Sequence, residues 1–135
     1  MATRLNPYLN FQGTARDAME FYRGVFGGEL RIMTFGDYGG EPADGVMHAQ
    51  LDTPAGYTLM ASDMPPGQSV TAGGPITISL SGDDSGELTG YFEKLAEGGT
   101  VAEPLKQQMW GDTFGMLVDR YGIGWMVNIA GEENR

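Results

Sequence analysis

The spacing of apolar residues along the chain predicts two amphipathic helices. In "TARDAMEFYRGVFGG" (14–28) and "DDSGELTGYFEKLAEGG" (83–99), apolar side chains recur three or four positions apart, which places them on one helical face. Thr14 and either Asp84 or Ser85 are the predicted N-caps, and a pair of glycines ends each segment. The predicted buried faces are Ala15, Ala18, Met19, Tyr22, Val25 and Phe26, and Leu88, Tyr91, Phe92, Leu95 and Ala96.

Alternating apolar and polar residues predict eight strands around these helices. One strand precedes each helix and three follow it, because period-two alternation is typical of half-buried strands. Their ranges are 5–11, 29–35, 46–52 and 57–63 in the first half, and 75–81, 100–110, 114–119 and 124–130 in the second. The order strand, helix, three strands therefore occurs twice, at an offset of about 70 residues, which predicts an internal repeat.

This repeat predicts an α+β fold made of two βαβββ modules. Helices cover one face of each sheet, so that face is apolar, and the other face curls around an open cup. We predict one domain over residues 1–135. Its parts are module one (1–63), a linker rich in Pro and Gly (64–74), module two (75–130) and a short tail (131–135).

Alternation also assigns a direction to the strand residues. Toward the helices we place an apolar set: Leu5, Leu9, Phe11, Leu59, Ile76, Ile78, Leu80, Trp125, Val127 and Ile129. Toward the cup we place a mostly small and polar set: Asn6, Tyr8, Asn10, Thr58, Met60, Ser62, Thr77, Ser79, Met126 and Asn128. A slip of one residue would exchange the two sets and bury asparagine and serine side chains against helices without partners.

Composition and charge narrow the class of protein. Asp and Glu outnumber Lys and Arg by 18 to 8, and the formal net charge of -10 disfavours nucleic acid and anionic membranes as partners. No apolar run approaches the roughly 18 residues that span a membrane, and the first residues lack the pattern of a secretory signal. We therefore expect a cytoplasmic protein. The sequence contains no cysteine, which excludes disulfides, thiolate metal sites and cysteine nucleophiles.

Four stretches carry a resemblance to a known family: "PYLNF" (7–11), "AMEFYRGVFGGEL" (18–30), "MHAQL" (47–51) and "MWGDTFGMLVDRYGIGWMVNI" (109–129). In this order the chain resembles the vicinal oxygen chelate superfamily of glyoxalases, bleomycin-resistance proteins and extradiol dioxygenases, and within it the PhnB-like branch. The resemblance implies a tandem βαβββ fold and a homodimer. It also implies that related enzymes hold a divalent metal in the cup through His and Glu side chains.

Carried over one at a time, the metal-ligand positions of the family fall on Asn6 (or Pro7 if the register differs by one), Met60, Thr77 and Met126. Two thioethers, an amide and a hydroxyl are poor ligands for Zn, Fe, Mn or Ni. We therefore predict no metal and no other cofactor. The leading interpretation is a metal-free protein that binds a small, planar or hydrophobic molecule, with sequestration of a natural product or antibiotic as its sharpest form.

The predicted ligand cavity combines cup-facing strand residues with one loop tryptophan: Asn6, Tyr8, Asn10, His48, Gln50, Met60, Thr77, Ser79, Trp110, Met126 and Asn128. Trp110 fits either a pocket wall or the core. His48, the only histidine, is the one candidate for acid–base catalysis. A lyase, isomerase or oxygenase with a non-standard site at His48 is the alternative, so whether the chain is an enzyme stays open. A structural dimer with a vestigial cup is a third hypothesis.

Aspartates and glycines mark the remaining features. Asp52 and Asp63 end strands and are interpreted as turn or cap residues, Asp112 as the anchor of a loop, and Asp119 as the organiser of the "DRYG" turn. The Gly-rich segment 36–45 lacks the residues of a phosphate-binding loop, so a flap over the cup is the better interpretation.

Overall fold

The computed structural model describes residues 4–64 and 75–131. The predicted linker, apart from its first residue, and the predicted tail, apart from Gly131, lie outside the described residues. The chain divides into two compact units, Met1–Val70 and Thr71–Arg135. No helix in the described part of the chain has the length and apolar composition that crossing a bilayer requires.

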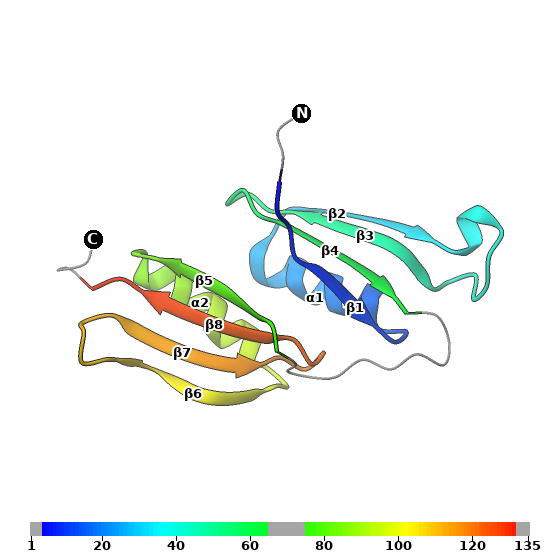
Figure 1. Cartoon of the computed structure of the whole chain (residues 1–135). Coiled ribbons are helices and arrows are strands. Elements are labelled where there is room, and N and C mark those ends of the chain that lie inside the picture. The colour runs from blue at the N-terminus through cyan, green and yellow to red at the C-terminus, as the bar shows by residue number, and fades with distance from the viewer. Residues whose placement is uncertain (1–3, 65–74, 132–135) are drawn as a thin grey trace. The chain divides into compact units, whose positions relative to one another are not determined.

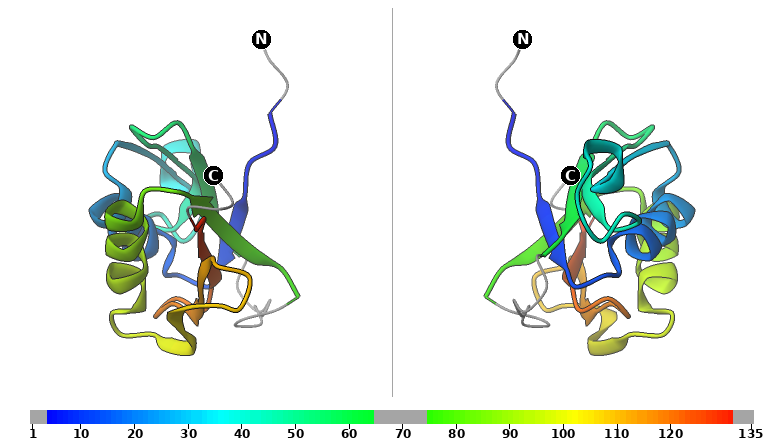
Figure 2. Two further views of the ribbon diagram at one scale, coloured as in Figure 1. Left: turned by 90° about the vertical axis from the view of Figure 1, so that its left-hand side faces the viewer. Right: turned by 90° about the vertical axis from the view of Figure 1, so that its right-hand side faces the viewer.

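The described residues of the first unit form one α-helix, one short 3-10 helix and a four-stranded mixed sheet (Figure 1). Its elements are β1 (Tyr8–Phe11), α1 (Ala15–Phe26), β2 (Glu29–Thr34), the short 3-10 helix η1 (Gly36–Tyr38), β3 (Val46–Asp52) and β4 (Thr58–Asp63). The strand order is β1-β4-β3-β2, and β1 runs parallel to β4 while the other pairs are antiparallel. Helix α1 packs on one face of this sheet, against β2, β3 and β4 (Figure 2).

The second unit repeats this arrangement. Its elements are β5 (Thr77–Gly82), α2 (Ser85–Ala96), β6 (Thr100–Gln107), β7 (Thr113–Val118) and β8 (Gly124–Ile129). The strand order is β5-β8-β7-β6, again with a parallel first pair, and α2 packs against all four strands. The predicted α+β fold of two βαβββ modules is therefore confirmed.

Most of the residues predicted to face the helices are buried: Leu9, Phe11, Leu59, Leu80, Trp125, Val127 and Ile129. Ile78 is half-buried. Leu5 and Ile76 are 100% and 81% exposed, so the prediction that they pack against helices is wrong. The reason is that β1 and β5 begin only at Tyr8 and Thr77, so the two apolar side chains precede the sheets.

The two helices begin in different ways. Thr14 occupies the N-cap position of α1, as predicted, but its side chain makes no capping hydrogen bond. The carboxylate of Asp63, at the end of β4, accepts the backbone N–H groups of Ala15 and Val46, each at 2.9 Å. In α2 the predicted cap is confirmed, because Asp84 accepts a backbone N–H of the first helical turn at 3.0 Å. The start of α1 thus depends on a distant residue, and the start of α2 on a neighbouring one.

Glycines at equivalent positions follow both helices. Gly28 has a φ of +106°, and a Cβ there would lie 2.1 Å from the carbonyl oxygen of Asp52. A Cβ at Gly99 would lie 2.4 Å from the carbonyl oxygen of Val118. The neighbouring strand passes so close to each position that a side chain has no room there.

Asp119 organises the turn before β8, as predicted. It is 3% exposed, and its Oδ1 accepts the backbone N–H groups of Tyr121 at 2.8 Å and Ile123 at 3.1 Å. Its Oδ2 accepts the indole N–H of the buried Trp125 at 2.8 Å. One carboxylate therefore fixes both the turn and the largest side chain of the second core.

Candidate functional site

The face of the first sheet opposite α1, called here the open face, carries a continuous row of side chains. The row runs across four strands, because Tyr8 pairs with Met60, Met60 with Gln50, and Gln50 with Arg31. The next residues along β3 and β4, Ala49 and Ala61, are fully buried on the α1 side. Since successive side chains alternate between faces, the predicted direction of Tyr8, Gln50 and Met60 is confirmed.

His48 lies on the same open face and contacts this row. Its Nδ1 is 3.1 Å from the hydroxyl oxygen of Tyr8, and the two ring centroids are 5.7 Å apart. Because Nδ1 is occupied by the phenol, Nε2 is the ring nitrogen that remains for a further partner.

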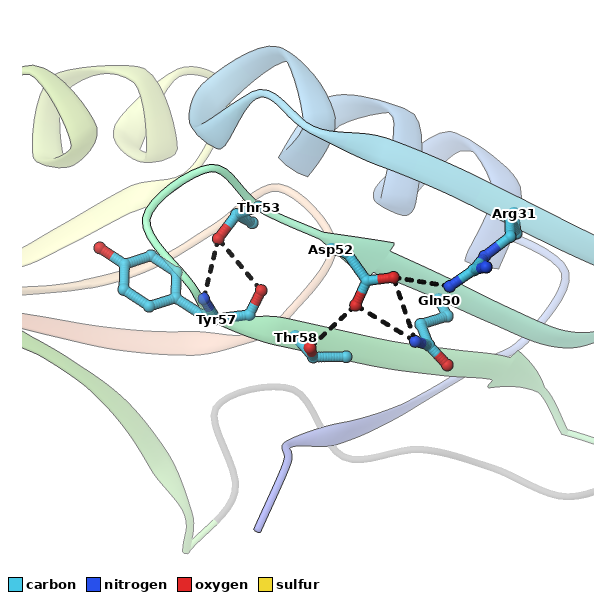
Figure 3. A network of polar contacts seen from close by, with 6 residues as sticks. All are labelled: Arg31, Gln50, Asp52, Thr53, Tyr57 and Thr58. Carbon is cyan, nitrogen blue, oxygen red and sulfur yellow. Dashed lines mark hydrogen bonds and ion pairs between the residues drawn. The ribbon is translucent and has the colours of Figure 1, made fainter. Parts of the chain in front are cut away.

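Asp52 is the centre of a polar network at the end of β3 (Figure 3). Its carboxylate accepts a hydrogen bond from Arg31 at 2.7 Å, one from the Thr58 hydroxyl at 2.9 Å, and two from the Gln50 amide at 3.2 Å. The pKa of Asp52 is lowered, mainly by the hydrogen bond from Gln50 and next by the one from Thr58. Partial burial raises this pKa, and the charge of Arg31 lowers it further. The prediction of Asp52 as a turn residue missed this role, and Arg31 was missed altogether.

The open face of the second sheet is more apolar. Ser79 pairs with Met126 across β5 and β8, and Met126 pairs with Met116 of β7. Asn128 is the neighbour of Phe114 on the same face, whereas Thr77 lies opposite Gly124 at the start of the strand pair. The pleat thus places the predicted residues of β5 and β8 opposite the α2 side, as the alternation indicates.

Asp112 holds the turn between β6 and β7 against β8. Its Oδ2 accepts the side-chain amide of Asn128 at 3.0 Å, and its Oδ1 accepts the backbone N–H of Gly131 at 2.9 Å. The predicted loop anchor is confirmed. Trp110, in the same turn, is 59% exposed, so its interpretation as a core residue is wrong.

Two further predicted residues lie near the first strand. Asn6 precedes β1 and is half-buried, and Asn10 is exposed on the same face as Tyr8. That Asn6 and Asn10 share one ligand cavity with the nine other residues of the predicted set stays a prediction.

A pocket of about 470 Å³ opens in the first unit at the start of α1, and no residue of the predicted cavity lines it. Its lining residues are Gln12, Gly13, Arg16, Asp17, Phe35, Pro42, Asp44, Gly45, Asp63 and Met64. The segment 36–45, predicted to be a flap, closes on itself through backbone bonds of Phe35 to Gly45 and of Gly36 to Ala43. The pocket joins segments that are distant in sequence, so no local pattern indicated it.

The residues at the family's metal positions do not fit a metal ion. Asn6, Met60, Thr77 and Met126 offer one amide, two thioethers and one hydroxyl, which are weak ligands for borderline divalent cations. Across residues 4–64 and 75–131, no three or more His, Cys, Asp or Glu side chains gather closely enough to hold a metal.

A mixed four-stranded sheet with one covering helix, built twice in the order βαβββ, defines the class of tandem βαβββ proteins. Residues 4–127 match the Glyoxalase/Bleomycin resistance protein/Dioxygenase superfamily, and the chain belongs to this family. The predicted resemblance is thereby confirmed.

Relatives include Protein YjdN of Escherichia coli, which is 26% identical over 96% of this chain and 97% of that protein. The crystal structure of protein PA1353 from Pseudomonas aeruginosa is 38% identical, with a TM-score of 0.84 over 95% of this chain and 98% of that chain. A PhnB protein from Bacillus cereus is 26% identical, with a TM-score of 0.73 over 95% of this chain and 100% of that chain.

Proposed function

We propose that the chain binds a small organic molecule, without a metal, on the open face of its sheets. The observation that carries this proposal is the row Tyr8–Met60–Gln50 with His48 beside it. A phenol ring and an imidazole offer stacking surface, a thioether adapts to irregular shapes, and an amide supplies hydrogen bonds. Such a mixed lining suits a planar or hydrophobic ligand that carries a few polar groups.

In its sharpest form, the proposed function is sequestration of a natural product or antibiotic. Binding then proceeds through stacking, shape and hydrogen bonds, and no covalent bond is made or broken. We propose further that the protein acts as a homodimer, as the family resemblance implies, and light scattering of the purified protein measures this directly.

Thermal unfolding tests the binding proposal. Untagged protein is screened against planar aromatic natural products and fractionated cell extract, and the variant Met60→Lys is compared with the control Glu20→Lys. Met60 lies in the middle of the row, whereas Glu20 is exposed on α1. A ligand at about 100 times its Kd stabilises by about 2.7 kcal/mol, which raises Tm by about 10 °C for a chain of this size.

We expect this rise in wild type and in Glu20→Lys, and its loss in Met60→Lys. A rise that survives in Met60→Lys contradicts the proposed site. Metal analysis of the same untagged preparation tests the metal-free part of the proposal, and one equivalent of Ni, Zn, Mn or Fe per chain contradicts it.

The hydrogen bond between Tyr8 and His48 favours a second candidate function, proton transfer by an enzyme. A histidine oriented through Nδ1 presents Nε2 as a general acid or base to a bound substrate. In this case His48→Gln keeps ligand affinity and loses turnover, and Tyr8→Phe lowers turnover less. If no ligand found in the screen is converted by wild type, this candidate is rejected.

A further inference from the structure

A carboxylate fixes the orientation of the amide in the centre of the open face. The Nε2 of Gln50 donates to both oxygens of Asp52 at 3.2 Å. The other partners of that carboxylate, Arg31 and Thr58, are also donors. An ionised carboxylate only accepts hydrogen bonds, so the amide must turn its NH2 group toward Asp52. Figure 3 shows the amide oxygen of Gln50 turned away from Asp52.

The second unit contains the same device with different residues. The Nδ2 of Asn128 donates to Asp112 at 3.0 Å, and Asp112 is itself held by the backbone N–H of Gly131 at 2.9 Å. The Oδ1 of Asn128 is therefore turned away from the carboxylate for the same reason. In the described part of the chain, neither amide oxygen accepts a hydrogen bond from another protein group.

We propose that Asp52 and Asp112 are positioning residues that fix the amides of Gln50 and Asn128, so that each amide presents its carbonyl oxygen on the open face of its own sheet and selects ligands with N–H or O–H donors. This inference rests on the proposed binding function and names its ligand class. Rotating either amide by 180° would bring two acceptors within about 3 Å of each other, which removes a charge-assisted hydrogen bond and adds repulsion. A ligand that offers only acceptors therefore finds no hydrogen-bond donor in the amide oxygen at either position.

The charges around Asp52 determine the pH range in which its carboxylate fixes the orientation of the Gln50 amide. On β2, Arg31 donates to Asp52, and Glu29 is its direct cross-strand neighbour; on β4, the partner is the uncharged Thr58. The lowered pKa of Asp52 means that the carboxylate stays ionised at neutral pH. The Gln50 amide is thus locked at neutral pH and released in acid.

Side-chain amide signals in nitrogen-15 NMR spectra test the positioning role in the protein without ligand. Gln50→Met assigns the Gln50 signals by removing them. We expect the two Nε2 protons of Gln50 to shift as the pH falls through the Asp52 titration and to lose this dependence in Asp52→Asn, while the Asn128 signals stay unchanged in that variant. Asp112→Asn is the reciprocal control and affects Asn128 alone. If the Gln50 amide proton signals change neither in acid nor in Asp52→Asn, the positioning role of Asp52 is overturned.

A pair of probes of nearly equal size tests the ligand class. N-methylbenzamide carries one N–H donor and N,N-dimethylbenzamide carries none, and both are titrated while the Gln50 signals are followed. One net hydrogen bond corresponds to about three- to tenfold tighter binding of the donor probe, and this preference disappears in Asp52→Asn. Equal affinities in wild type overturn the ligand class. An intact Asp52 titration without binding of either probe upholds the positioning role and counts against the proposed binding function.

Discussion

The replacement of Asp63 by Ala tests how the first unit holds the start of its helix. Asp63 is 9% exposed, and its carboxylate accepts two backbone N–H groups, from the first residue of α1 and the first residue of β3. Removing it leaves both donors without that acceptor, at about 1–3 kcal/mol each, and removes a negative charge from a helix N-terminus, worth about 0.3–1 kcal/mol. We expect Asp63→Ala to lower the free energy of unfolding by about 3–5 kcal/mol.

Asp84→Ala is the matched control, because it also removes an aspartate that binds the start of a helix. Asp84 is exposed and accepts one N–H group at 3.0 Å, so the expected loss is about 1 kcal/mol. For a chain of 135 residues, these losses correspond to a fall in Tm of about 10–20 °C for Asp63→Ala and about 3–5 °C for Asp84→Ala.

Urea denaturation followed by circular dichroism measures both losses. Asp63→Asn keeps one acceptor oxygen, so its free energy of unfolding should lie between those of wild type and Asp63→Ala. Equal losses for the two alanine variants would refute the reasoning, because they would show that the distant cap contributes no more than the local one.

Three further predictions concern the turns and the polar network. Gly28→Ala should cost about 2–4 kcal/mol in denaturation experiments, since φ is positive and the new Cβ meets backbone, whereas Gly24→Ala, which has open space in α1, should stabilise by about 0.5–1 kcal/mol. Asp119→Ala should cost about 3–5 kcal/mol and change the fluorescence of Trp125; unchanged emission with unchanged stability would contradict the role of that carboxylate. Asp52→Asn should lower the free energy of unfolding by less than about 1 kcal/mol at pH 7. The folded-state pKa of Asp52 is lowered, so the difference from wild type should vanish as the pH falls below 3.8, and a difference that persists in acid would argue against the lowered pKa.

The sequence was sufficient to predict the elements, because burial leaves a period in the order of apolar residues. All six residues of the predicted α1 face are buried, and β3 has the predicted bounds. The predictions for Leu5 and Ile76 were wrong because the apolar–polar alternation begins before the chain enters the sheet. Only the partner strand decides where a strand begins, and a single sequence does not contain that pairing.

The candidate site was predictable in its side-chain directions and not in its contacts. Period two places Tyr8, Gln50 and Met60 on one face, and the same rule applied to β2 would have added Arg31. The bond between Tyr8 and His48 spans 40 positions and requires the order of strands in the sheet. The cap that Asp63 supplies to α1 spans 48 positions and is equally invisible to local patterns.

The separation between Asp63 and α1 has a consequence for synthesis on the ribosome. The α2 helix receives its cap from an adjacent residue, so the capping carboxylate is already present when the first turn emerges. The capping carboxylate of α1 is translated only 48 residues after the helix begins, which takes roughly 2–10 s at about 5–20 residues per second. Two modules with the same topology therefore acquire their helix caps at different stages of synthesis: the second before its three later strands are made, and the first only with the end of its last strand.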